Sequence, residues 1–417
     1  MKIIADLHIH SKYSRAVSQE MTLENIGIWA QRKGLKVVGT GDFTHPEWFR
    51  AIKEKLKEQE PGLFILREAA PEKATRFMLT TEIASIYSKN HKMRRIHNLI
   101  FAPSLKAVER INTKLSWVGN LKADGRPILG LDSKELLKII LDADPRCVLV
   151  PAHAWTPWFS IFGSMSGFDS IEECFDEMSK YIFSIETGLS SDPAMNWRLS
   201  ALDKITLISN SDSHSLERIG REANVFDCEL SYDAIIDAIR TGDPQRFLFT
   251  IEFFPEEGKY HYDGHRDCKV SQSPEQTKKN GGICPVCGKK LTIGVLNRVE
   301  QLADRPAGFK PAGAIPFKSL VQLDEIIADV LGVGVKSKSV QEIYNGLINK
   351  IGSELKVLLE ASQEQIAEAG DVRIAEGVIR VREGRVKLIP GFDGEYGKIS
   401  IFDEGEESSG PQPTLFG

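Results

Sequence analysis

The amino-acid sequence predicts an α/β protein, from the length of the chain and from a regular alternation of two kinds of segment. The 417 residues are too many for one ordinary domain and enough for two or three, each with its own core. Up to about residue 250, short apolar runs typical of strands alternate with amphipathic patterns typical of helices. This alternation indicates βαβ units, and therefore a parallel sheet or a (β/α) barrel.

Seven apolar runs are the predicted strands of this part of the chain. They cover residues 2–10, 35–45, 76–83, 94–102, 147–155, 181–188 and 204–214. Between them, the segments 23–34 and 133–144 place apolar residues at helical spacing. Each strand followed by a helix adds one βα unit, so the carboxyl ends of the strands are expected at one end of the fold.

Nearly every predicted strand ends in side chains that can bind a metal ion or exchange a proton. The first run, "KIIADLHIHS", places Asp6, His8 and His10 at alternate positions, which share one face of a strand. The other runs end in Asp42, His45, Glu82, His97, His153, Glu186, Asp212 and His214. Because the sites of parallel barrels form at the carboxyl ends of their strands, we expect these side chains to converge.

A convergent set of imidazoles and carboxylates predicts a site for several divalent ions. A single histidine at a strand end is usually a hydrogen-bonded structural residue, but such a regular series is not explained in that way. These ligands suit Zn²⁺ or Mn²⁺, and their number exceeds the needs of one tetrahedral ion, so we expect two or three ions. Ions of this kind activate water and neutralise phosphate oxygens, which predicts hydrolysis of a phosphomonoester or a phosphodiester.

The ordered motifs "DLHIHS", "GDFTHP", "TTEI", "RIHNL", "PAHAW" and "NSDSHS" resemble those of the PHP (polymerase and histidinol phosphatase) metallohydrolases. The resemblance covers residues 1–250 and implies a distorted (β/α)7 barrel with Zn²⁺, Mn²⁺ or Mg²⁺ in its catalytic site. It implies one ion on His8, His10, Glu82 and Asp212, a second on Glu82, His97 and His153, and a third on His45 and His214. The second motif usually has adjacent Asp and His, whereas Asp42 and His45 are three apart, so either could be the ligand.

Residues 251–300 contain a second metal-binding pattern. His265-x-x-Cys268 and Cys284-x-x-Cys287 are two ligand pairs separated by fifteen residues, which is typical of a zinc ribbon. His261 could replace His265, although the spacing to Cys268 favours His265. A closed four-ligand site stabilises a segment too short to bury a core, so we expect structural Zn²⁺ without a catalytic role.

Residues 301–402 are predicted to be mainly helical. Leu320, Leu323, Ile327 and Val330 form one apolar stripe, and "LGVGVKSKS" lies between two helical patterns. This segment resembles the hairpin of helix-hairpin-helix DNA-binding elements, in which backbone N–H groups contact a phosphate. Lys336 and Lys338 would add positive charge there. An ordinary turn between helices is the alternative.

The last segment, residues 403–417, has a composition that predicts disorder, because its acidic, Ser, Gly and Pro residues cannot build a core. It nevertheless ends in "QPTLFG". Gln412, Leu415 and Phe416 match the short peptide by which replication and repair enzymes bind the sliding clamp, PCNA. A random apolar terminus is the alternative.

In this order, the four parts resemble endonuclease Q, an archaeal family with bacterial relatives. The resemblance implies a DNA repair endonuclease that cuts 5′ to hypoxanthine, uracil, xanthine or an abasic site. Such an enzyme must extrude the damaged base, and the loop after His153 could wall its pocket with Trp155 and Trp158. Arg94 and Arg95, beside His97, are candidate phosphate contacts.

Two other functions fit part of the sequence. A phosphatase of the histidinol-phosphate type explains the metal motifs but not the ribbon, the hairpin or the clamp peptide. A non-catalytic DNA-binding adaptor recruited to the clamp does not explain why every metal motif is present. The net charge of −5 indicates no extended basic surface. Neither a signal peptide nor an apolar run of spanning length is recognisable, which predicts a cytoplasmic, chromosome-associated protein.

Overall fold

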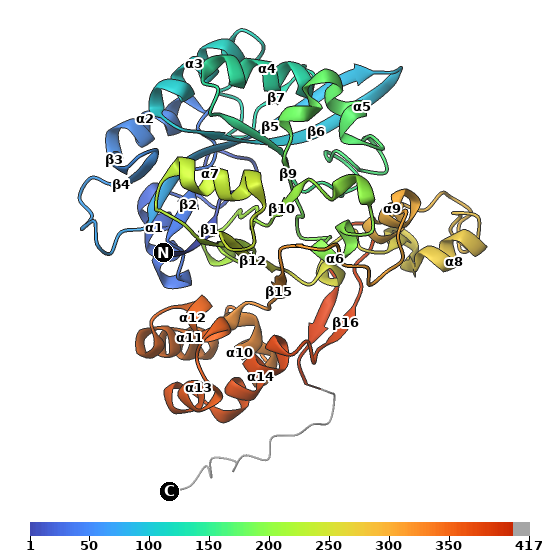
Figure 1. Cartoon of the computed structure of the whole chain (residues 1–417). Helices are drawn as coiled ribbons and strands as arrows, with labels where there is room; N and C mark the ends of the chain where they lie inside the picture. The colour runs from blue at the N-terminus through green and yellow to red at the C-terminus, as the bar shows by residue number, and fades with distance from the viewer. Residues whose placement is uncertain (403–417) are drawn as a thin grey trace, which may run out of the picture.

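The computed structural model describes residues 1–402 and has a mixed α/β fold (Figure 1). The predicted α/β class is therefore confirmed. Helices surround the strands of the largest sheet, and a group of helices from the end of the described chain lies below it (Figure 1). The clamp-binding peptide, with Gln412, Leu415 and Phe416, lies outside the described residues.

The largest sheet combines parallel and antiparallel strands. Its central strands are β1 (Lys2–Asp6), β2 (Val37–Gly39) and β5 (Arg76–Lys89), which pair in parallel. On one side β5 pairs with antiparallel β6 (Lys92–Ala102), which pairs with β8 (Val148–Pro151). On the other side β1 pairs with antiparallel β11, followed by β12 and β15. The remaining bounds are β3 (Leu56–Glu60), β4 (Leu63–Leu66), β7 (Ile128–Leu129), β11 (Ala223–Asp227), β12 (Phe247–Glu252) and β15 (Phe317–Ser319).

All seven apolar runs contain a strand, but the strands of residues 1–402 do not form a closed hydrogen-bonded barrel. The last two predicted strands, β9 (Ser184–Glu186) and β10 (Thr206–Ile208), pair only with each other. The two edges of β1 pair with β2 and with β11. The segment after β10 therefore adds no strand beside β1 and forms an isolated bridge between Ile9 and Ser213. The mixed α/β fold thus agrees with the prediction, whereas the strands of the expected distorted (β/α)7 barrel do not close by hydrogen bonds within residues 1–402.

Helices cover the sheet where apolar residues recur at helical spacing. The predicted helices at 23–34 and 133–144 are α1 (Leu23–Lys33) and α4 (Ser133–Ala143). Thr22 caps the start of α1 by accepting from the Asn25 backbone N–H, and Gly34 ends it in the left-handed region at φ 94°. The other helices here are α2 (Pro46–Lys55), α3 (Leu105–Ser116), α5 (Ile171–Phe175), α6 (Pro193–Asn196) and α7 (Tyr232–Thr241).

The segment with the predicted zinc ligands projects to one side of the sheet (Figure 1). It contains the hairpin of β13 (Asp263–His265) and β14 (Val270–Gln272), then α8 (Pro274–Lys279) and α9 (Val295–Leu302). Short 3₁₀ turns cover residues 176–181, 200–202, 216–218, 255–257 and 266–268. No helix in residues 1–402 is long and apolar enough to cross a membrane.

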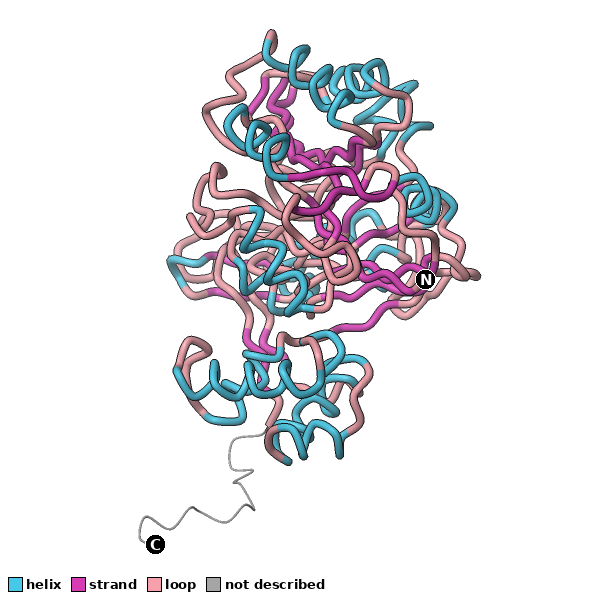
Figure 2. The backbone as a smooth tube through the Cα atoms, turned by 90° about the vertical axis from the view of Figure 1, so that its left-hand side faces the viewer, coloured by secondary structure: helices cyan, strands magenta, loops and turns pink. Residues whose placement is uncertain are grey.

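The helices of the last part lie together at one end, away from the main strands (Figure 2). They are α10 (Leu323–Leu331), α11 (Lys338–Ile351), α12 (Glu354–Leu359), α13 (Gln363–Ala369) and α14 (Val372–Arg382), followed by the hairpin of β16 (Lys387–Ile389) and β17 (Lys398–Ser400). Leu320, Leu323 and Ile327 of the predicted stripe are buried. The helical pattern that follows "LGVGVKSKS" in the sequence, over residues 340–360, forms two helices, because Ser353 caps a new helix directly after Gly352.

A buried ion pair fastens these helices to α1. The Nζ of Lys33 lies 2.6 Å from Oε2 of Glu354, and both side chains are at most 3% exposed. The hydroxyl of Tyr344 donates to the same Glu354 oxygen at 2.6 Å, and the backbone N–H of Leu323 donates to Oε1 at 3.2 Å. The carboxylate of Glu354 thus joins α1 to three parts of the helical group.

Candidate metal centre

Side chains from five strands and the segments after them meet on one side of the central sheet. His8 and His10 follow β1, His153 follows β8, and Asp212 follows β10. Glu82 and His97 lie inside β5 and β6, whose register places Glu82 opposite Leu99 and His97 opposite Ala84. His97 is therefore the diagonal neighbour of Glu82 on the same face of the hairpin. The predicted convergence includes these six side chains, although two of them are in strand interiors.

The first group consists of His8, His10, Glu82 and Asp212, whose ligand atoms all lie within 4.8 Å of one another. The Nε2 of His10 is 3.3 Å from Oε2 of Glu82 and 3.1 Å from Oδ1 of Asp212. The Nε2 of His8 is 3.7 Å and 3.6 Å from the same two oxygens. Both imidazoles thus direct the same ring nitrogen at the same pair of carboxylates.

The second group shares Glu82 with the first and adds His97 and His153. The Oε1 of Glu82 lies 2.8 Å from Nδ1 of His97 and 3.1 Å from Nε2 of His153. Each carboxylate oxygen of Glu82 therefore faces a different group. This arrangement is the one expected of a carboxylate that bridges two cations.

The chemistry of these donors fits divalent ions. Nε2 of His8, Nε2 of His10 and Oδ1 of Asp212 are buried, and none has a hydrogen-bond partner in the described residues. Buried polar atoms without partners are costly, so three that face one another indicate a ligand that satisfies them. His8, His10 and Glu82 are at most 1% exposed, whereas the Asp212 side chain is 25% exposed, so the group opens to solvent beside Asp212.

The electrostatics of the site favour positive charge. Burial would lower the pKa of His8, but the negative charges of Glu186, Glu82 and Asp212 outweigh it and raise the pKa well above its usual value. Burial would raise the pKa of Glu82, yet His97, Arg126 and His8 hold it well below its usual value. In His97 burial dominates and lowers the pKa to about 4, so its imidazole is neutral, the form that binds a metal.

Glu186 orients His8 and the backbone of His153 from outside the two ligand groups. Its oxygens lie 3.0 Å and 3.1 Å from Nδ1 of His8, and its Oε2 accepts the backbone N–H of His153 at 2.8 Å. Asn210 donates to Glu186 at 2.9 Å. Asp6 does not join the ligands, because its oxygens accept the backbone N–H groups of Ser211 and Gly220. It holds the segment that carries Asp212.

Asp42 lies behind His10. Its Oδ1 is 3.0 Å from Nδ1 of His10, and its Oδ2 accepts from the backbone N–H and hydroxyl of Ser11 and from the hydroxyl of Ser14. The carboxylate is fully used by these contacts. We therefore assign Asp42 the orientation of His10, in place of the predicted metal ligation.

This assignment predicts that Asp42→Asn lowers metal affinity without removing a ligand. An amide cannot accept all four hydrogen bonds, so the imidazole of His10 loses its fixed orientation. We expect the affinity for divalent ions to fall about 10- to 100-fold, as is typical when a residue that orients a metal ligand is substituted. Calorimetric titration of the metal-stripped protein with Mn²⁺ or Zn²⁺ measures this change. Asp144→Asn, at the end of α4 and outside the ligand groups, is the control, and equal affinities for all three proteins would contradict the assignment.

The predicted third group, His45 with His214, stays a prediction. No metal-binding group of three or more residues within residues 1–402 contains Asp42, His45 or His214. His45 precedes α2, and its ring stacks on Tyr13 with a centroid separation of 4.3 Å. His214 turns its Nδ1 to the carbonyl of Asp212 at 2.8 Å, and its ring packs edge-on against His10. Local contacts thus hold the two rings in different surroundings.

The backbone is left-handed at several residues of the site. Asp42, His153 and Asp212 have φ values of 49°, 29° and 45°, a region that residues other than glycine seldom occupy. Gly188 is packed against the strained His153, since a Cβ there would lie 2.5 Å from the Cβ of His153. These conformations turn the side chains toward the cluster directly after their strands end.

The predicted DNA-contacting residues near His97 differ in their exposure to solvent. Arg94 and Trp155 are buried, which is at odds with a contact to DNA. The Arg94 guanidinium lies 4.0 Å from the ring centre of Phe168 and bonds the Gly167 carbonyl, so it braces the loop after His153. The indole of Trp155 donates to Asn196 at 2.7 Å inside the core.

Arg95 and Trp158 lie in more open positions. Arg95 is exposed, and its guanidinium lies 5.8 Å from the ring centre of Phe159, whose ring also packs on His97 at 4.6 Å. Trp158 is half-buried, with its ring 5.7 Å from that of Tyr260. Lys336 and Lys338 are exposed where Gly332 ends α10 and Ser337 caps α11. DNA binding by these four residues stays a prediction.

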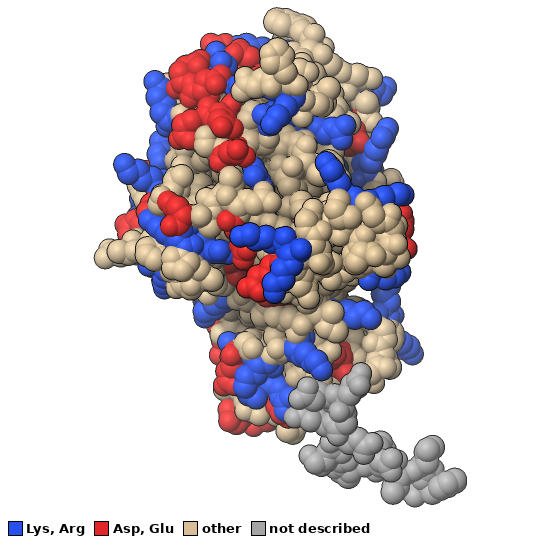
Figure 3. Space-filling view, turned by 90° about the vertical axis from the view of Figure 1, so that its right-hand side faces the viewer, with Lys and Arg blue, Asp and Glu red and all other residues tan. Residues whose placement is uncertain are grey.

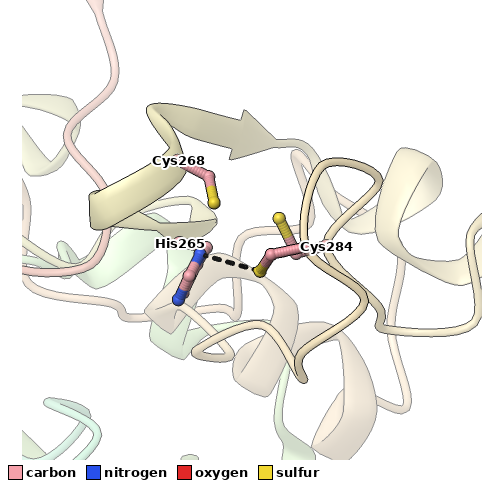
Figure 4. Close-up of side chains that lie close together, drawn as sticks. His265, Cys268 and Cys284 are labelled. Atoms are coloured by element: carbon pink, nitrogen blue, oxygen red, sulfur yellow. Dashed lines mark hydrogen bonds between the residues drawn. The ribbon is translucent and has the colours of Figure 1, made fainter.

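The second metal-binding pattern also comes together. His265, Cys268, Cys284 and Cys287 form one group whose ligand atoms lie within 4.8 Å of one another. The Sγ of Cys287 is 3.5 Å from Nδ1 of His265. Figure 4 shows the side chains of His265, Cys268 and Cys284 pointing toward one another. His261 is not part of this group, so the geometry favours His265. One nitrogen and three sulfur donors suit Zn²⁺.

Two charged residues of the site are absent from the sequence-based ligand set. The position of Glu186 at a predicted strand end indicates a residue near the site, but it does not specify the role of that residue. Arg126 lies in a segment without periodicity, and its Nη1 donates to Oε2 of Glu82 at 3.0 Å. Only the fold brings this arginine to the cluster.

Comparisons with known proteins agree with this architecture. Residues 322–385 match the family model described as the MJ0043 C-terminal domain. The uncharacterized protein MJ0043 of Methanocaldococcus jannaschii is 32% identical over 260 residues, or 60% of this chain. Those residues are 31% of MJ0043, so the chain spans less than a third of that relative.

Two solved structures match nearly the whole chain. The lesion-specific endonuclease PfuEndoQ from Pyrococcus furiosus has a TM-score of 0.84 and 32% identity, over 96% of this chain and 95% of that one. Endonuclease Q in complex with a 27-mer duplex substrate, with an abasic lesion at the active site, has a TM-score of 0.85 and 33% identity. That match covers 97% of each chain.

Proposed function

The chain belongs to the endonuclease Q family and is a metal-dependent DNA endonuclease, and from this premise we propose that it repairs DNA by hydrolysing the phosphodiester 5′ to a damaged nucleotide. The proposed lesions are hypoxanthine, uracil, xanthine and the abasic site. The observation that carries the proposal is the pair of ligand groups that share Glu82, in a chain that matches an endonuclease bound to lesion-bearing duplex over 97% of its length.

The proposed chemistry is hydrolysis with two divalent ions. His8, His10, Glu82 and Asp212 would hold one ion, and Glu82, His97 and His153 a second. When bound, such ions supply activation of a water nucleophile and neutralise the charge that develops on the phosphodiester oxygens. The protein fixes the donors in advance: Glu186 orients His8, Asp42 orients His10, and burial keeps His97 neutral.

The rest of the chain is proposed to hold the DNA. We propose a PHP-type catalytic part at 1–250, a Zn²⁺ ribbon at 251–300 and a DNA-binding helical part at 301–402. On the face shown in Figure 3, Lys and Arg side chains are spread over the height of the molecule. Separate positively charged side chains suit an extended phosphate backbone, because each contact with a phosphate contributes to the binding affinity. Arg95, Trp158, Lys336 and Lys338 are the proposed contacts.

A cleavage assay tests the proposal. The protein is stripped with EDTA, reloaded with Mn²⁺, Mg²⁺ or Zn²⁺, and incubated with labelled duplexes that carry one deoxyinosine, deoxyuridine, deoxyxanthosine or abasic site. We expect a single nick 5′ to the lesion and no cleavage of the matched undamaged duplex. Histidinol phosphate is tested in parallel. Release of phosphate from it, without nicking, would support the phosphatase instead, and inactivity on every substrate would support the adaptor.

We further propose that the end of the chain binds a sliding clamp of the PCNA type through Gln412, Leu415 and Phe416. These residues lie outside the described residues, so the proposal rests on their sequence alone. A peptide tethered by a linker raises the local concentration of enzyme at the clamp without fixing its orientation on DNA.

Deletion of residues 412–417 is the matching prediction. We expect unchanged nicking of naked duplex, because the active site is far from this segment in sequence, and loss of clamp stimulation and of clamp binding in a pull-down. A variant in which only Leu415 and Phe416 become alanine should behave in the same way. Retention of clamp binding by both variants would contradict the proposal.

A further inference from the structure

Arg126 lies next to both ligand groups but belongs to neither. Its Nη1 donates to Oε2 of Glu82 at 3.0 Å, and within residues 1–402 its guanidinium makes no other hydrogen bond. The Arg126 side chain is 25% exposed, whereas that of Glu82 is fully buried. The guanidinium therefore extends from the buried bridging carboxylate to the solvent side of the cluster, and its Nε and Nη2 groups have no protein acceptor there.

The backbone that carries Arg126 is held firmly against the site. The backbone N–H of Arg126 donates to Oδ1 of Asp124 at 3.1 Å, and that of Gly125 donates to the Tyr13 carbonyl at 3.0 Å. Gly125 packs so closely that a Cβ there would lie 2.4 Å from Oδ2 of Asp42. Asp42 orients His10, so the same contacts fix Arg126 relative to the first ligand group.

The simpler role for Arg126 is to neutralise the charge of Glu82. Other side chains around Glu82 already provide partners for its carboxylate, so this role does not by itself explain the arginine. Glu82 already faces four imidazoles, from His8, His10, His97 and His153. The guanidinium carries five N–H donors, and its planar fork matches a phosphate. An arginine side chain stays protonated in proteins, so Arg126 is always cationic.

We propose that Arg126 is a catalytic residue that binds a non-bridging oxygen of the scissile phosphodiester and stabilises the negative charge gained during hydrolysis. This inference rests on the proposed function, because it assumes a DNA phosphate beside the cluster. The phosphate would lie against the open side of Glu82 and Asp212, where the two free guanidinium nitrogens can donate to its oxygens. No proton leaves Arg126 in this role.

Single-turnover nicking of an abasic-site duplex gives the first test. We expect Arg126→Gln to lower the rate constant about 10²- to 10³-fold, as when one fixed transition-state donor is removed. Arg126→Lys keeps the charge but loses the fork, so its rate should lie between those of the wild type and the Gln variant. Arg15→Gln is the matched control, because Arg15 pairs with Asp124 on the same side but is 84% exposed. It should retain the wild-type rate.

A binding experiment without metal separates phosphate contact from site assembly. Fluorescence anisotropy in EDTA compares the duplex with a duplex in which the phosphate 5′ to the abasic site is a neutral methylphosphonate. The wild type should lose affinity about tenfold with the neutral linkage, as expected for one charge-assisted hydrogen bond. The Arg126→Gln protein should bind both duplexes equally, and Arg15→Gln should behave as the wild type.

The possible results decide between distinct conclusions. Wild-type nicking together with full activity of Arg126→Gln would overturn the role of Arg126 and leave the proposed function intact. The same holds if Arg126→Gln retains the tenfold preference for the charged linkage. Metal analysis must show equal ion content in all the variants, and loss of ions from Arg126→Gln alone would also overturn the phosphate role. A wild type that nicks no lesion would instead refute the proposed function.

Discussion

Glu82→Gln is expected to abolish nicking while the protein stays folded. Glu82 is the only residue common to both ligand groups, and each of its oxygens faces a different group. An amide offers one neutral oxygen, so it cannot serve both. Since a bound ion supplies several kcal/mol of transition-state stabilisation, we expect the rate constant to fall by at least about 10³-fold. Single-turnover assays at saturating Mn²⁺ measure the loss, and mass spectrometry of the metals should show fewer bound ions.

Glu222→Gln is a control with matched burial. Glu222 is fully buried, and burial together with the charge of Glu252 raises its pKa well above the usual value. A protonated carboxyl differs little from an amide, so this variant should nick at the wild-type rate. Asp212→Asn should resemble Glu82→Gln, because Asp212 supplies to the first group an oxygen that has no hydrogen-bond partner in the described residues. Normal turnover by Glu82→Gln and Asp212→Asn would overturn the metal centre.

Among the substitutions proposed for this protein, Lys33→Met should cause the largest decrease in the free energy of unfolding. The substitution removes the ammonium group that neutralises Glu354 and leaves a carboxylate that is only 3% exposed without a cation. Breaking a buried pair in this way typically costs about 3–5 kcal/mol. Chemical denaturation followed by circular dichroism and by tryptophan fluorescence measures the free energy of unfolding and shows whether the transition remains cooperative.

Two controls isolate the buried charge. Adding Glu354→Gln to Lys33→Met removes the unpaired charge, so the double variant should regain most of the lost stability. Lys53→Met breaks an exposed pair with Glu109, whose side chains are 44% and 53% exposed, and should have almost no effect. Equal stability of Lys33→Met and the wild type would mean that α1 and the helical group are held by apolar packing alone.

The sequence predicts which side chains converge better than it predicts the sheet that carries them. His8, His10, His153 and Asp212 follow strands, as their positions after apolar runs indicate. A parallel barrel would place His97 at the carboxyl end of its strand. In the structure Asn90 and His91 form a tight turn with positive φ, β6 runs antiparallel to β5, and His97 lies inside it. A polar turn of this kind is visible in a sequence, but the pairing that it allows is a tertiary property.

The roles of individual carboxylates depend on contacts that no local pattern reveals. Asp42 has the type and position of a ligand, yet Ser11 and Ser14 turn it into a support for His10. Arg126 has no signal at all, because a non-periodic segment carries it to Glu82. In contrast, the spacing of His265, Cys268, Cys284 and Cys287 is local, and these four side chains do come together.

The left-handed backbone at Asp42, His153 and Asp212 has a consequence for the evolution of this fold. Each such conformation of a residue other than glycine costs about 1 kcal/mol, so the geometry that serves cleavage weakens the folded state. A library selected only for resistance to heat, with no demand for DNA cutting, would accumulate glycine or asparagine at these three positions. Homologues that have lost catalytic activity should show the same replacement by glycine or asparagine at these positions.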